Sequence, residues 1–251
     1  MKKIVIILYC FIFILTLGAC SHISAPQEFA YREIQTSFFK IASWQKISVP
    51  TADYRIYIEG DGYSFDSRGL PTTNPTPHSI MMRQAAFNDP HPNVIYLARP
   101  CQFVKDDKCE EKYWTVARFA DEVINSEAEA IQSIVRQQPI TVIGFSGGAQ
   151  VAGLLTIKKL NILKIITIAG NLDHRLWTEY HHLPPLNESL NAADYKYLLD
   201  HIEQIHFIGG KDTVIPAQLN KKIAKNKSII TLPNASHNQG WEDAFAQIYA
   251  E

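Results

Sequence analysis

Short apolar runs alternate along this chain with stretches of helical periodicity. Apolar residues spaced three or four apart predict a long amphipathic helix at residues 114–138, and further helices begin at Gly147 and at Trp241. Strands of a few apolar residues separated by helices predict βαβ units, and hence an α/β fold whose mostly parallel sheet has helices on both faces. The expected strands are residues 54–58, 93–98, 140–143, 163–168, 205–208 and 228–232.

The first 19 residues have the pattern of a bacterial lipoprotein signal. Met1-Lys2-Lys3 precedes an apolar run at residues 4–17 that is too short for a comfortable membrane span. The run ends in Leu17-Gly18-Ala19-Cys20, which resembles the lipobox at which signal peptidase II cuts before a lipid-modified Cys. We expect residues 1–19 to be removed, and residues 20–44 to hold the lipidated Cys20 and a tether to the bilayer. An ordinary signal peptide with a chance Cys, or an uncleaved anchor, is the alternative.

Composition and charge limit the possible binding partners and the cellular compartment. The chain has 251 residues, of which 46% are hydrophobic, so one domain at residues 45–251 can build a full core. A formal net charge of −1 does not favour nucleic acid as a partner. Ser21, rather than Asp, follows Cys20, and this resembles Gram-negative signals that sort a lipoprotein to the outer membrane. We therefore expect a lipid-anchored protein of the cell envelope that faces the periplasm.

Two cysteines remain for the folded domain. Cys10 leaves with the signal and Cys20 is the lipid site, so Cys101 and Cys109 form a pair in a chain bound for an oxidising compartment. We expect these two residues to form a disulfide. A metal site is the alternative, which the lack of a nearby His cluster disfavours.

A glycine-rich phrase follows the apolar run at residues 140–143. Gly144-Phe145-Ser146-Gly147-Gly148 matches G-x-S-x-G and precedes a predicted helix, which is the setting of a nucleophile elbow. Such a turn holds Ser146 in a strained backbone conformation and leaves little room for a Cβ beside it. The helix behind it supplies unpaired N–H groups and a partial positive charge. The alternative is a glycine-rich turn with a helix-capping Ser.

A serine hydroxyl needs a base to become a nucleophile, and the base needs an acid that orients it. Asp212 lies in the loop after the strand at residues 205–208, and His237 lies in the loop after the last strand. The chain order Ser146, Asp212, His237 is the order that accompanies this elbow. Asp173 is the main rival acid. The rival bases, which we expect in a cap segment or in the core, are His174, His181, His182, His201 and His206.

These phrases resemble the α/β-hydrolase superfamily, and the resemblance covers residues 45–251. It implies an α/β-hydrolase fold with a small cap segment between the strands that end at Ile168 and begin at Ile205. It also implies that Ser146 is the nucleophile, that His237 is the general base and then the acid, and that Asp212 holds the imidazole tautomer. No metal or organic cofactor is implied. The matching phrases are Gly144-Phe145-Ser146-Gly147-Gly148, Gly209-Gly210-Lys211-Asp212 and Ala235-Ser236-His237.

The resemblance further implies two backbone donors for a developing oxyanion. One is the N–H of Gly147, and the other is the N–H of Asp61, in the phrase Glu59-Gly60-Asp61-Gly62. The family usually has His-Gly where this chain has Glu59-Gly60, so substrate preference does not carry over. A carboxylate on Asp61 near the site is expected to disfavour anionic substrates. The alternative is that residues 60–62 only make a turn.

Together these inferences predict a carboxylesterase-like serine hydrolase that cleaves an ester or related acyl bond of a small-molecule substrate through an acyl-enzyme. A peptidase or amidase with the same three residues is one alternative, because the fold serves both chemistries. The other is a non-catalytic lipoprotein that keeps the hydrolase scaffold for envelope binding. The presence of Ser146, Asp212 and His237 together argues against the last alternative.

Overall fold

A computed structural model describes residues 24–223 and 228–251, so the expected signal and Cys20 lie outside the described residues. The strands are β1 (Ala30–Gln35), β2 (Lys40–Ile47), β3 (Tyr54–Ile58), β4 (Asn93–Leu97), β5 (Ile140–Phe145), β6 (Ile162–Ile168), β7 (Glu203–Gly209) and β8 (Ser228–Leu232). The helices are α1 (Met81–Asn88), α2 (Asp121–Val135), α3 (Gly147–Leu154), α4 (His174–Tyr180), α5 (Lys196–Leu199), α6 (Ala217–Ile223) and α7 (Glu242–Tyr249), with short 3-10 turns at η1 (Glu111–Trp114), η2 (Leu155–Ile157) and η3 (Ala192–Tyr195).

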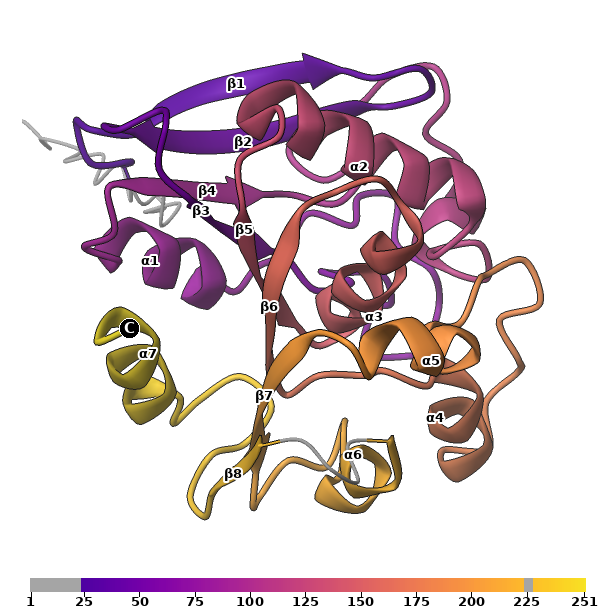
Figure 1. Ribbon diagram of the computed structural model, residues 1–251. Coiled ribbons are helices and arrows are strands. Elements are labelled where there is room, and N and C mark those ends of the chain that lie inside the picture. The colour runs from indigo at the N-terminus through magenta and orange to yellow at the C-terminus, as the bar shows by residue number, and fades with distance from the viewer. Residues whose placement is uncertain (1–23, 224–227) are drawn as a thin grey trace, which may run out of the picture.

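One eight-stranded sheet, in the order β1-β2-β4-β3-β5-β6-β7-β8, organises the molecule (Figure 1). From β4 to β8 neighbouring strands run parallel, whereas β1 and β2 form an antiparallel hairpin at one edge, with β2 antiparallel to β4. Every residue of β3 and β4 is buried, because parallel central strands are covered on both faces. The mostly parallel α/β sheet predicted from the sequence is therefore confirmed.

Helices cover the sheet in two layers, each with its own apolar core. On one face α2 and α3 pack on the strands, and on the other face α1 and α7 do so (Figure 1). The register of the parallel strands aligns their carboxyl ends at one edge of the sheet, where the loops with the candidate site residues begin. Ile58 at the end of β3 pairs with Gly144 in β5, and Gly209 at the end of β7 pairs with Leu232 at the end of β8.

The expectation that residues 20–44 form only a lipidated Cys and a tether is wrong for residues 30–44. These residues form β1 and the first half of β2, so the folded domain begins earlier than residue 45. β1 looks like a tether in the sequence because it is an edge strand, with most of its side chains exposed. Phe39 and Ile41 are fully buried and anchor the hairpin to the core.

The long helix predicted at residues 114–138 is shorter than expected. Its expected first residue, Trp114, ends the 3-10 turn η1, an irregular stretch follows, and α2 runs only from Asp121 to Val135. The apolar spacing continues through this stretch because Ala117 and Phe119 are buried without being helical. The irregular stretch also carries Arg118, whose side chain points back into the molecule.

Cys101 and Cys109 form a disulfide, as the sequence predicts. It closes the loop that follows β4, a loop that also carries Arg99 and Gln102. Among the described residues, no helix has the length and apolar character needed to cross a membrane.

Candidate active site

Ser146 lies in a sharp turn between β5 and α3. Its φ of 51° and ψ of −118° place a non-glycine residue in a rarely populated backbone conformation. Hydrogen bonds hold the turn: the N–H of Ser146 donates to the carbonyl of Ile168 at 3.0 Å, and its own carbonyl accepts from the N–H of Asn171 at 3.0 Å. A Cβ on Gly144 would lie 2.5 Å from the carbonyl oxygen of Gly148, so the turn needs glycine there. The strained strand-to-helix turn predicted from the sequence is present.

Three side chains from separate loops form a row at this turn. His237 Nε2 lies 3.1 Å from Ser146 Oγ, and His237 Nδ1 lies 3.0 Å from Asp212 Oδ2. The second oxygen of Asp212 accepts hydrogen bonds from the N–H groups of Val214 at 2.8 Å and Ile215 at 2.9 Å. The buried carboxylate is therefore fixed, with one oxygen free for the imidazole. This arrangement favours the tautomer with its proton on Nδ1, which leaves Nε2 to accept the serine proton.

Asp173, the rival acid, has a structural role as a helix cap. Asp173 caps α4, and its side chain accepts from the N–H groups of Arg175 and Leu176. It also accepts a hydrogen bond of 2.8 Å from the amide of Asn191. Its position and its partners are those of a helix cap.

The rival histidines lie elsewhere. His206 is buried in β7, where Nδ1 lies 2.9 Å from Thr167 Oγ1. His174 is also buried, and burial lowers the pKa of its imidazole. His181 Nε2 lies 2.9 Å from the carbonyl of Val214, and His182 and His201 are exposed. Among the described hydrogen bonds, none joins these rivals to the hydroxyl of Ser146.

The residues expected to supply the oxyanion donors lie beside the nucleophile. We call residues 59–62 the oxyanion loop; it follows β3, whose last residue pairs with Gly144. Asp61 and Gly147 line the same hollow as Ser146. Within the part of the chain that the structure describes, neither the N–H of Asp61 nor that of Gly147 donates a hydrogen bond to another protein group. Both donors are therefore available to a ligand.

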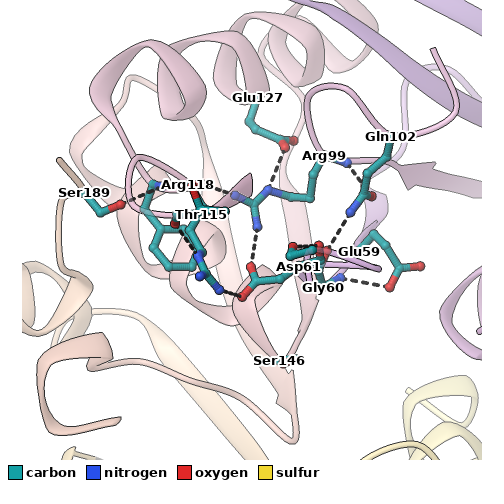
Figure 2. A network of polar contacts seen from close by, with 12 residues as sticks. Glu59, Gly60, Asp61, Arg99, Gln102, Thr115, Arg118, Glu127, Ser146 and Ser189 are labelled. Carbon is teal, nitrogen blue, oxygen red and sulfur yellow. Dashed lines mark hydrogen bonds and ion pairs between the residues drawn. The ribbon is translucent and has the colours of Figure 1, made fainter. Parts of the chain in front are cut away.

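The surroundings of the Asp61 side chain differ from those expected from the sequence. It does not stand alone beside the site: Arg118 Nη1 lies 2.7 Å from Oδ2, and Arg99 Nη1 lies 3.4 Å from Oδ1 (Figure 2). The carboxylate is thus compensated by two cations, and the expectation that it would repel anionic substrates loses its basis. Sequence reasoning missed both arginines, because neither belongs to a motif and both lie far from Asp61 in the chain.

The hollow above Ser146 has a volume of about 390 Å³. Its walls include several aromatic side chains, among them Tyr63, Phe65 and Trp177. Trp177 comes from the predicted cap segment, and its indole N–H donates to the carbonyl of Val214 at 2.8 Å. The cap segment therefore contributes one wall, whereas its other aromatic residues, Tyr180, Tyr195 and Tyr197, do not line the hollow. Among the described residues no group of three or more His, Cys, Asp or Glu side chains is placed to hold a metal ion.

Comparisons with known proteins identify the fold. No family model and no curated protein matches this sequence. Among solved structures, the chain is similar to the esterase Pf2001 of Pyrococcus furiosus, with a TM-score of 0.62, 16% identity, and coverage of 89% of this chain and 91% of that one. It is similar to Est1E of Butyrivibrio proteoclasticus, with a TM-score of 0.60, 12% identity, and coverage of 88% and 96%. It is also similar to an α/β fold family hydrolase of Bacillus anthracis, with a TM-score of 0.56, 12% identity, and coverage of 88% and 98%. The chain therefore has the α/β-hydrolase fold.

Proposed function

We propose that this protein is a serine hydrolase that cleaves an ester or related acyl bond of a small-molecule substrate. The observation that carries the proposal is the hydrogen-bonded row of Asp212, His237 and Ser146, with distances of 3.0 and 3.1 Å. The printed name of one similar protein, the esterase Pf2001, supports the same reaction class.

The reaction follows from the row. Ser146 Oγ attacks the acyl carbonyl carbon while His237 Nε2 takes the serine proton, and Asp212 stabilises the imidazolium that forms. The N–H groups of Gly147 and Asp61 receive the negative oxygen of the tetrahedral intermediate. His237 then gives its proton to the leaving alcohol, and an acyl-enzyme remains. Water, deprotonated by His237, attacks the acyl-enzyme, and His237 returns that proton to Ser146 Oγ as the acid is released.

A fluorophosphonate probe tests the proposal. The full chain purified in detergent is expected to be labelled once, at Ser146, and to hydrolyse p-nitrophenyl esters. Ser146→Ala is expected to lose both properties, whereas Ser133→Ala, which changes a serine on α2, is expected to keep both. Esters of graded acyl length and the matching p-nitroanilides then compare chain length and the amide alternative. No labelling of the folded wild-type chain would instead favour a non-catalytic envelope-binding protein.

We further propose that the protein is anchored in the bacterial envelope through acylated Cys20, in the outer membrane facing the periplasm. The lipobox-like Leu17-Gly18-Ala19-Cys20 supports the anchor, and the Cys101–Cys109 disulfide supports a compartment outside the cytoplasm. Metabolic labelling with an alkyne fatty acid is expected to mark the wild-type chain and Cys10→Ser but not Cys20→Ser. Labelling that persists in Cys20→Ser would rule out this anchor.

A further inference from the structure

A carboxylate lies where the proposed reaction needs positive potential. A Cβ built on Gly147 would lie 2.0 Å from Asp61 Oδ1 and 2.9 Å from Oδ2, so the Asp61 carboxylate packs against the backbone of Gly147. The N–H of Gly147 is one of the two donors proposed for the oxyanion. An uncompensated negative charge at this distance would oppose the charge that develops on the substrate oxygen.

Two buried guanidinium groups hold this carboxylate, one on each oxygen (Figure 2). The Arg118 side chain is 7% exposed and the Arg99 side chain 5% exposed, whereas the Asp61 side chain is 25% exposed, so solvent reaches these contacts only from the side of Asp61. Arg118 Nε also donates to the carbonyl of Thr115 at 2.6 Å, and Arg99 Nη2 donates to the carbonyl of Arg118. The two cations are therefore tied to each other and to the backbone.

The backbone of the oxyanion loop is held by the same network. Gln102 Nε2 donates to the carbonyl of Gly60 at 3.0 Å, and Gln102 Oε1 accepts from the N–H of Arg99 at 3.1 Å. On the other side, Glu59 accepts from the N–H of Gly60 at 2.9 Å and from the hydroxyl of Tyr96 at 2.6 Å. Gln102 thus holds the peptide that carries the Asp61 N–H through its carbonyl, and Glu59 holds the peptide before it (Figure 2).

Glu127 is the second acidic group near Arg99. It lies on α2, fully buried, with Oε1 3.3 Å from Arg99 Nε but not aligned for a hydrogen bond. Burial raises the pKa of the Glu127 carboxyl to about 8, and the charge of Arg99 offsets this only in part. Burial thus favours the neutral form of Glu127, which leaves the charge of Arg99 available to Asp61.

We propose that Arg118 and Arg99 are positioning residues of the hydrolase: they compensate the Asp61 carboxylate beside Gly147 and hold the Asp61 N–H in the oxyanion hole. This inference rests on the proposed function. Arg118 carries the larger share, because its contact with Asp61 is the shorter one. Neither arginine needs to touch the reacting atoms for this role.

A charge-reversal cycle tests the proposal on the full chain in detergent, with p-nitrophenyl acetate as substrate. Active sites are counted by fluorophosphonate titration, so that unfolded protein does not enter kcat. Arg118→Gln is expected to lower kcat about 10- to 100-fold, with KM changing far less, because Asp61 then keeps only the longer contact with Arg99 and its less compensated charge opposes the oxyanion. Adding Asp61→Asn to that variant is expected to restore kcat at least about fivefold, because the opposing charge is removed. A loss of packing alone would not be repaired by the second change.

The matched control is a buried arginine–carboxylate pair outside this network, Arg55–Asp89, whose Nη1 and Oδ1 atoms are 3.0 Å apart. It joins β3 to the residue after α1, away from the hollow, so Arg55→Gln is expected to keep kcat per labelled site. If Arg118→Gln gives no labelled protein, Arg99→Gln with and without Asp61→Asn makes the same comparison.

Three results separate the possible failures. A wild-type kcat in Arg118→Gln would overturn the inference, and so would a loss that Asp61→Asn fails to repair. If the folded wild-type chain neither reacts with the probe nor hydrolyses the ester, the proposed function itself fails, and not this inference alone.

Discussion

Replacing Glu127 by Gln tests the charge state of the cluster behind the oxyanion loop. The Glu127 side chain is fully buried, and Oε1 lies 3.3 Å from Nε of the charged Arg99. Burial raises the pKa of its carboxyl from 4.5 to about 8. The folded protein therefore keeps a proton that the unfolded chain loses, and the free energy of unfolding falls as pH rises from about 4.5 until it levels off above pH 8. Gln cannot ionise, so the variant lacks this pH dependence.

The size of the effect follows from the pKa difference. Linkage over the interval from pH 6 to pH 8 gives a wild-type loss of about 2 kcal/mol from this one group. The free energy of unfolding of Glu127→Gln is thus expected to rise relative to wild type by that amount across the interval. Urea unfolding of both proteins at pH 6, 7 and 8 measures the difference.

The control is Glu129→Gln, on the same helix but exposed, where the carboxylate contacts Ser37. Its stability difference from wild type is expected to stay constant over this interval. A difference between Glu127→Gln and wild type that also stays constant from pH 6 to pH 8 would refute the reasoning. Glu127 would then be ionised in the folded protein, and the charge of Arg99 would be shared between two carboxylates.

Three further predictions address the site and its supporting loop. Gly147→Ala is expected to lower kcat by about tenfold or more, because its Cβ would lie 2.0 Å from Asp61 Oδ1 and displace the oxyanion loop; kinetics on titrated active sites measure this, and an unchanged kcat would contradict it. Asp212→Asn is expected to lower kcat on the order of 10⁴-fold in a folded protein, because the amide favours the wrong imidazole tautomer; a loss below about tenfold would argue against Asp212 as the orienting acid. Replacing Cys101 and Cys109 by Ser is expected to lower the free energy of unfolding by less than ~3 kcal/mol. It is also expected to lower kcat, because Arg99 and Gln102, which hold the oxyanion loop, flank Cys101. A reductant should lower the kcat of the wild type and leave that of the double variant unchanged.

The central strands could be predicted because burial on both faces leaves a direct trace in the sequence. The expected bounds of β3 agree with the structure and those of β4 differ by one residue. The bounds of β8 agree as well, although β8 is an edge strand and only partly buried. The turn around Ser146 was equally visible, since it needs glycines at fixed positions. Asp212 and His237 were found because strand order and register place the loops after β7 and β8 at one edge. Local pattern and topology suffice for such features.

Other elements have no such recognisable pattern in the sequence. β1 is an edge strand with mostly exposed side chains, so its pattern resembles a polar tether. Helix α1 was not predicted, because it is short and has neither a capping side chain at its start nor charged residues that mark its ends. The partners of Asp61 lie 38 and 57 residues away, in the loop after β4 and in the irregular stretch before α2. Their meeting depends on tertiary packing, which single-sequence periodicity does not encode.

The network gives a physical reason for the unusual Glu59-Gly60 phrase of this chain. Glu59 is buried, and burial raises the pKa of its carboxyl, although the hydroxyl of Tyr96 and the N–H of Gly60 act in the opposite direction. Its side chain braces the peptide of Gly60 from behind, while Gln102 holds the carbonyl of the same residue. The next residue, Asp61, brings a charge that would be harmful alone and becomes an attachment point for two arginines. The oxyanion loop is therefore fixed by ion pairs and buried hydrogen bonds from β4, from the loop after it and from the irregular stretch before α2, so changes remote from Ser146 are expected to alter kcat through this loop.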